Sequence, residues 1–177
     1  SRSYNWGYHT EPEARTGNRG FFWPRGRALG GSSSVNAMIY TRGHPHDYDH
    51  WAALGNPGWD YQSVLPWFRK SERQQRGADH WHGNQGSMDV VDTNHHFPAS
   101  EAFVQACGEA GQVLNNDFNG ADQEGCGFFQ VTQTPAGQRA NSAYSFLDEA
   151  RSRPNLTVMT GAHVTRICFS GKTATGV

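Results

Sequence analysis

The chain has 177 residues, enough for one domain with its own core or for parts of two. Its 15 basic and 16 acidic residues give a net charge of −1, which excludes the strongly basic surface of a nucleic-acid-binding protein. For that reason no nucleic-acid partner is expected. No run approaches the roughly 18 apolar residues of a membrane span, so no integral membrane segment is expected either.

In the first 40 residues, few of the apolar residues recur at a regular spacing. Residues 1–25 are polar and aromatic, and we expect them to form an extended loop. Residues 26–34 are mostly glycine and serine and are typical of a tight turn of small residues. Serines are good helix N-caps, so a helix is predicted to begin within residues 35–40.

Two further helices are predicted before residue 76. Pro45 suits the first turn of a helix, and Gly55 can end that helix in the left-handed conformation. Ser63 is the expected cap of the next helix, with Pro66 in its first turn, where the missing N–H is no loss. Residues 76–87 are expected to form a loop.

The second half of the chain mixes helical and strand patterns. Apolar residues recur at helical spacing from Pro98 until Gly111 ends the pattern. Asn141 can cap another helix, which Pro154 stops. Strands are predicted over residues 87–91, 125–134, 156–160 and 163–169. The sequence therefore predicts a mixed α/β fold (α+β in composition), with helices and strands intermingled.

The stretch most informative about chemistry is the glycine- and serine-rich turn. Gly30 and Gly31, followed by three serines, give a backbone with almost no side-chain bulk, which a flat or anionic ligand can approach closely. A helix beginning there would add N–H donors and a positive dipole end. A tight turn before an ordinary helix explains the spacing equally well, so spacing alone leaves both interpretations open.

The run GRALGGSSSVNAMIYTRGHPHDYD, residues 26–49, resembles the first signature of glucose–methanol–choline (GMC) flavoenzymes. The agreeing positions are Gly26, Arg27, Leu29, Gly30, Gly31, Ser32, Ser33, Asn36, Tyr40, Gly43 and Asp49. Similar agreement continues through Trp6–Pro12, Gly58–Tyr61, Val64–Phe68, His82-Gly83, Asp117–Gly120, Gly137-x-Arg139, Arg153–Leu156 and Ala162-x-Val164. Essentially the whole chain is covered, and the resemblance is closest to bacterial choline dehydrogenases and related alcohol dehydrogenases.

The resemblance implies a division of the chain between two domains of a larger enzyme. Residues 1–85 would be part of a GMC-type FAD-binding domain and would include the flavin-covering segment. Residues 86–138 would begin the substrate-binding domain, and residues 139–177 would return to the FAD-binding domain.

The resemblance also implies a set of cofactor-binding residues. Those that would line the flavin are Gly31, Ser32, Asn36, Ala37, Met38 and Ile39. Val164 would meet the adenine through its backbone. Some family members attach FAD through a histidine just before the asparagine; Val35 stands there in this chain, so FAD would be bound noncovalently.

The implied activity is oxidation of a primary alcohol, choline-like or aliphatic, to an aldehyde by hydride transfer to the flavin. The chain contains no G-x-G-x-x-G motif and nothing that matches the family's catalytic histidine, so no catalytic residue is predicted in it. We therefore expect an internal fragment, inactive and without FAD on its own, whose partners are an alcohol and the rest of its parent chain. The expected location is cytoplasmic, with peripheral attachment to the inner membrane left open.

Two other interpretations remain open. The chain could be a non-catalytic binding or assembly module derived from such an enzyme, with exposed aromatic residues facing a partner. A weaker interpretation is a phosphate-binding domain that uses residues 30–32 as its cradle. A metal site is not expected, because the nine histidines show neither zincin spacing nor pairing with cysteines.

Overall fold

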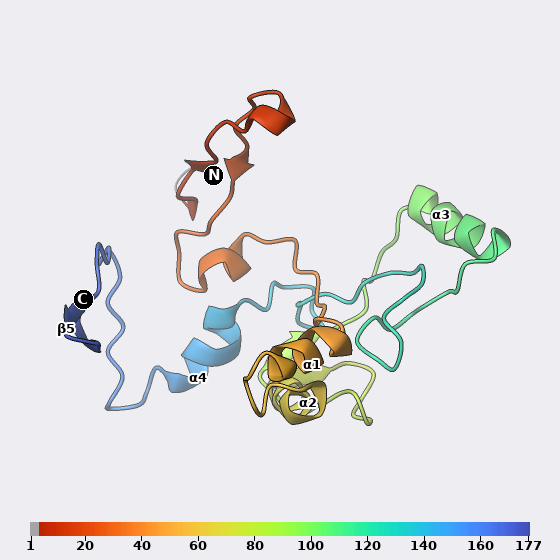
Figure 1. The fold of residues 1–177 in the computed structure, drawn as a ribbon. Helices are drawn as coiled ribbons and strands as arrows, with labels where there is room; N and C mark the ends of the chain where they lie inside the picture. The colour runs from red at the N-terminus through yellow and green to blue at the C-terminus, as the bar shows by residue number, and fades with distance from the viewer. Residues whose placement is uncertain (1–3) are drawn as a thin grey trace.

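The computed structural model describes residues 4–177, and residues 1–3 of the predicted first loop lie outside it. Its elements, drawn in Figure 1, are β1 (Tyr8–His9), η2 (Ala14–Thr16), β2 (Phe22–Trp23), η3 (Gly31–Ser34), α1 (Pro45–Ala53), α2 (Tyr61–Ser71), β3 (Glu72–Gln74), β4 (Met88–Val90), α3 (Pro98–Glu109), η4 (Ala143–Leu147), α4 (Asp148–Ala150), β5 (Cys168–Ser170) and β6 (Thr173–Gly176). The mixed α/β class is confirmed.

The beginning of the described chain is a hairpin, so the predicted loop over residues 1–25 is wrong in part. β1 and β2 pair antiparallel, with Tyr8 opposite Trp23 and His9 opposite Phe22. The two strands are exposed, which explains why no alternation of apolar and polar residues announced them. In Figure 1 this hairpin stands away from the helices at the centre of the molecule.

Helices α1 and α2 confirm the two predicted helices and correct one cap. α1 begins at Pro45, and Gly55 follows it with φ 98°. The N-cap of α2 is Asp60, whose carboxylate accepts from the Ser63 N–H at 3.0 Å. Ser63 is therefore inside the first turn, and Pro66 lies farther along the helix than predicted.

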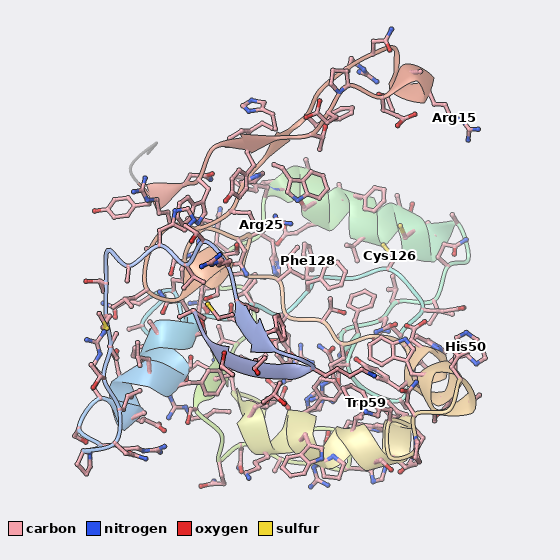
Figure 2. All side chains as sticks on the ribbon, turned by 60° about the vertical axis from the view of Figure 1, so that its left-hand side comes forward. Arg15, Arg25, His50, Trp59, Cys126 and Phe128 are labelled. Atoms are coloured by element: carbon pink, nitrogen blue, oxygen red, sulfur yellow. The ribbon has the colours of Figure 1, made fainter. Side chains whose placement is uncertain are left out.

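The second half of the chain agrees with the sequence where the signals are local. α3 and β4 fall inside their predicted ranges, and the N–H of Tyr144 donates to Asn141 Oδ1 at 2.9 Å, which confirms the predicted cap. Residues 156–167 form no strand, so the predicted strand over residues 156–160 is wrong. The one predicted over residues 163–169 is right only at its end, where Cys168 and Phe169 lie in β5 of the β5–β6 hairpin. Figure 2 shows Cys126 and Phe128 beside α3.

The predicted strand over residues 125–134 is reduced to isolated bridges. Val131 makes two of these bridges, with Val91 on one side and with Ile39 on the other. The N–H of each of Val91 and Val131 donates to the carbonyl of the other, at 3.0 and 2.9 Å. Val131 thereby ties the end of β4 to the segment that follows η3.

The centre of the molecule is rich in buried polar side chains. This central network consists of the buried residues Arg42, Glu72, Gln74, His82, Asn119 and Gln130, together with the half-buried Asp117. The carboxylate of Glu72, which is fully buried, accepts from Arg42 Nη2 at 2.8 Å and lies 3.0 Å from His82 Nδ1. The other ring nitrogen of His82 lies 2.9 Å from Asp117 Oδ2.

The charge on His82 is stabilised by this arrangement. Burial opposes that charge, but hydrogen bonds to Asp117 and Glu72 outweigh it and raise the pKa of His82 to about 9. The same hydrogen bond to His82 lowers the pKa of Asp117 against the opposing effect of its burial. The central network is therefore an internally paired set of charges that joins the regions around residues 42, 72, 82 and 117.

The chain leaves an unusual amount of its surface accessible. Its accessible area is 12761 Å², whereas a compact monomer of this size exposes about 8,600 Å². Large apolar side chains such as Trp67, Phe97 and Phe103 are 65–71 % exposed. Such exposure is typical of surfaces that pack against further polypeptide or a ligand.

Candidate functional site

The glycine- and serine-rich turn is compact at its base. We call residues 26–39 the Gly–Ser segment. Gly30 and Gly31 have φ angles of 86° and 55°, a region that glycine enters without strain. A Cβ on Gly26 would lie 2.0 Å from the carbonyl oxygen of Gly31, so only glycine fits at residue 26.

The helix predicted over residues 35–40 is wrong. A single 3₁₀ turn, η3, ends at Ser34, and a turn, a bend and the left-handed residue Met38 follow. The N–H of Tyr40 donates to the Gln130 carbonyl at 2.9 Å, and the N–H of Thr132 donates to Met38 O at 2.8 Å. These bonds with a distant part of the chain replace helical ones, so no long helix with a positive end opens here.

The outer side of the stretch after η3 is open. Ser32, Asn36, Ala37 and Ile39 are exposed, and half of the Ile39 surface is accessible. Between residues 4 and 177, the N–H groups of Ala37 and Ile39 have no hydrogen-bond partner. An apolar surface beside two N–H donors suits a flat heteroaromatic ring with acceptor atoms on its edge.

A cleft of about 530 Å³ lies at the other end of the Gly–Ser segment. Residues 26–29 and 159–164 form its two sides. The ring of Trp6 adds to its wall, 4.8 Å from the ring of His163, with the Arg27 guanidinium 5.0 Å from the Trp6 ring. This cleft suits the nucleotide part of a ligand, and it brings the predicted Val164 next to the segment that holds the other predicted residues.

A second part of the chain holds the Gly–Ser segment in place. Nη1 of Arg139 donates to Ser33 O at 3.1 Å and to Asn36 O at 2.9 Å. The hydroxyl of Ser142 donates to Gly30 O at 3.1 Å, and its N–H donates to Ser33 Oγ at 3.0 Å. Sequence reasoning missed this role of residues 139–142; the only available signal was the match of Gly137-x-Arg139 to the family pattern.

These observations test whether the chain fits FAD. The open backbone at Gly31, where a Cβ would meet nothing within 4 Å, the N–H donors of Ala37 and Ile39, and the neighbouring cleft fit a flavin and the nucleotide attached to it. Six of the seven predicted cofactor residues lie in the Gly–Ser segment, and Val164 lines the cleft.

Among residues 4–177, no group of three or more histidine, cysteine, aspartate or glutamate side chains is placed to hold a metal ion. Across those residues, no helix combines the length and the apolar character needed to cross a lipid bilayer.

Curated proteins similar to the chain are alcohol-oxidising enzymes. The chain is 46 % identical over 178 residues to an alcohol dehydrogenase (acceptor) of Pseudomonas putida and covers 32 % of that protein. It is 44 % identical over 174 residues to the mitochondrial choline dehydrogenase of Mus musculus and covers 29 % of it. These matches include 98–100 % of the chain. The chain thus spans about a third of the length of these relatives.

Solved structures and the family pattern agree with these relatives. Pyridoxine 4-oxidase from Mesorbium loti superposes on 98 % of the chain with a TM-score of 0.90 and 34 % identity, using 34 % of its own length. An FAD-dependent oxidoreductase from Chaetomium thermophilum superposes on 97 % of the chain with a TM-score of 0.86 and 32 % identity, over 32 % of its length. The sequence pattern of the GMC oxidoreductase family matches residues 13–177. The chain therefore belongs to the GMC oxidoreductase family.

Proposed function

We propose that the chain forms the flavin-facing part of an FAD-dependent oxidoreductase that oxidises a primary alcohol, choline-like or aliphatic, to an aldehyde. The observation that carries this proposal is the open stretch at Gly31, Ala37 and Ile39, which continues into the cleft at Val164. The names of its relatives, which include alcohol and choline dehydrogenases, support the substrate class.

Each predicted cofactor residue has a stated task in this proposal. Bound FAD supplies the hydride acceptor. Gly31 and Ser32 allow the ring to approach the backbone, and the N–H groups of Ala37 and Ile39 donate to acceptor atoms on its edge. Asn36 and Met38 set the course of this stretch. The cleft beside Val164 takes the adenosine part, and Val35 offers no atom for a covalent link.

We also propose the division of the chain into residues 1–85, 86–138 and 139–177. The last range returns to the first, because Arg139 and Ser142 hydrogen-bond to residues that precede them by more than a hundred positions. The middle range contains α3, which Figure 1 shows standing apart from α1 and α2. This arrangement supports a substrate-binding part between two contributions to one FAD-binding part.

The general base and the pyrophosphate-binding loop are proposed to come from the rest of a parent chain. The large accessible area supports this division of labour, because it offers apolar surface to further polypeptide. On its own, the 177-residue chain should be colourless and inactive. A cytoplasmic location, or peripheral attachment to a membrane, is proposed with it.

A segment exchange tests the proposed function. Residues 1–177 would replace the matching segment of the Pseudomonas putida alcohol dehydrogenase, which is 46 % identical. We expect a yellow protein with flavin absorbance that forms aldehyde from a primary alcohol and reduces an artificial acceptor. Comparing the rate of aldehyde formation from choline with the rate from aliphatic alcohols would show which of the two is the substrate. A folded hybrid without flavin would contradict the proposal and favour the binding or assembly module.

A further inference from the structure

The side-chain amide of Asn36 is held from two directions. Its Oδ1 accepts from Arg139 Nη1 at 2.7 Å and from the Met38 N–H at 3.1 Å. Both partners can only donate, so they fix which end of the amide is the oxygen. The amide nitrogen of Asn36 has no partner in the described chain, and the residue is exposed. Its two N–H donors are therefore available to a ligand.

Arg139 also fixes the backbone around this amide. The same Nη1 reaches the carbonyl oxygens of Ser33 and Asn36, at the end of the η3 turn. Carbonyls at the end of a helical turn carry partial negative charge and lack partners within the turn. A guanidinium satisfies them and the Asn36 oxygen together.

Met38 has an uncommon backbone conformation that depends on this support. Its φ is 65°, in the left-handed region that side chains other than glycine, asparagine and aspartate rarely adopt. Such strain persists only where the surroundings hold it. Here the Asn36 oxygen binds the Met38 N–H, and Thr132 binds the Met38 carbonyl. Releasing the amide would let Met38 relax.

We propose that Arg139 is a positioning residue, which orients the Asn36 amide so that its N–H donors face the bound flavin and which keeps Met38 left-handed. The edge of an isoalloxazine ring carries acceptor atoms, which such donors match. The identity of the ligand rests on the proposed function, whereas the dependence of Asn36 and Met38 on Arg139 can be measured without it.

The test compares Arg139→Met with Arg151→Met in the 177-residue chain. Arg151 is the matched control, because within residues 4–177 its side chain hydrogen-bonds only to Asp148, on the surface. NMR would measure hydrogen exchange of the Met38 amide and the side-chain amide signals of Asn36. We expect about tenfold faster Met38 exchange in Arg139→Met, the effect of losing one good hydrogen bond, and none in Arg151→Met. Millimolar guanidinium should restore protection in Arg139→Met, and sodium chloride should not.

Several results would overturn the proposal. Unchanged Met38 exchange in Arg139→Met is one, and equal acceleration in Arg151→Met is another. If guanidinium does not reverse the faster Met38 exchange, the substitution destabilises the fold in general, and Arg139 has no local role at Met38. If Arg139→Met does not fold, Asn36→Ala provides the second variant: it must accelerate Met38 exchange, and unchanged exchange would refute the mechanism.

Lumiflavin, an isoalloxazine without the nucleotide, separates this proposal from the proposed function. In the segment-exchanged enzyme freed of FAD, its titration should shift the Asn36 side-chain signals, and it should leave them unshifted when that enzyme carries Arg139→Met. If lumiflavin shifts no signal of the segment-exchanged enzyme while Met38 exchange in the 177-residue chain still depends on Arg139, the positioning role stands and the flavin assignment fails. Equal shifts in both proteins would overturn the orienting role of Arg139.

Discussion

The central network and the Gly–Ser segment use polar groups in opposite ways. In the central network, Glu72 is fully buried, and each of its oxygens has protein partners. In the Gly–Ser segment, the N–H groups of Ala37 and Ile39 are open and have no partner in the described chain. The paired, buried carboxylate of Glu72 helps to hold the fold, whereas exposed donors without a protein partner mark a surface prepared for a ligand.

The largest expected effect tests the structural side of this contrast. Glu72→Ala would leave Arg42 and His82 buried without their shared carboxylate, which should cost about 3–5 kcal/mol of unfolding free energy. Urea denaturation would measure the loss. Glu11→Ala is the control, because Glu11 is exposed and has no side-chain partner in the described chain, so it should change stability by less than about 0.5 kcal/mol. Similar losses of unfolding free energy in the two variants would show that the central network has no special role in stability.

The next effect is the pH dependence that His82 gives to stability. Its pKa is about 9 in the folded chain and 6.5 as the ordinary value, so folding favours the protonated ring. This stabilisation is complete below about pH 6.5 and is lost as pH rises through about 9, with a maximum of roughly 3 kcal/mol.

The comparison of wild type with His82→Gln isolates this term. Unfolding free energies at pH 6 and pH 10 should differ less in the variant, because the other titrating groups are common to both proteins. Equal pH dependence in the two proteins would show that His82 does not carry the charge assigned to it.

A smaller and more local effect is expected in the Gly–Ser segment. Gly31→Val and Gly171→Val place a branched side chain at nearly equal φ angles, 55° and 58°, each with nothing within 4 Å of the new Cβ. Both should lose about 1–2 kcal/mol of stability. In the segment-exchanged enzyme, only Gly31→Val should weaken FAD binding, by about tenfold or more. Equal FAD dissociation constants would contradict the assignment of this surface to the flavin.

The smallest expected effect measures how much an exposed ion pair contributes to stability. Arg151 and Asp148 form an ion pair at 2.7 Å, with each side chain about half exposed. Asp148→Ala should change the unfolding free energy by no more than about 0.5 kcal/mol, measured in the same urea experiment. A loss near that of Glu72→Ala would mean that burial does not explain the strength of the central network.

The sequence predicted the elements whose signals are local. Pro45 and the repeated apolar spacing after Pro98 identified α1 and α3. Asn141 was recognised as a cap because the required oxygen lies three residues from the N–H that it accepts. The cofactor-binding residues were predicted from the resemblance to a family. The physical properties of the same glycines alone fitted a simple turn equally well.

The failures share a physical cause, which is dependence on distant partners. The pattern of residues 35–40 predicts a helix, but hydrogen bonds to Gln130 and Thr132 hold Met38 and Tyr40 in an isolated bridge instead. Arg42 and Glu72 gave no sequence signal, because their pairing is made by the fold. Arg139 likewise reaches Asn36 across 103 positions, and no pattern within either segment announces that contact.

That long reach has a consequence for the order of folding during synthesis. Ser142 and Ser33, which hydrogen-bond to each other, are 109 positions apart. At 5–20 residues per second, the ribosome needs roughly 5–20 s between making one and making the other. Throughout that interval the nascent Gly–Ser segment has no Arg139 or Ser142 to hold it. Its final shape is therefore acquired late, and the segment stays accessible to chaperones while the middle of the chain is translated.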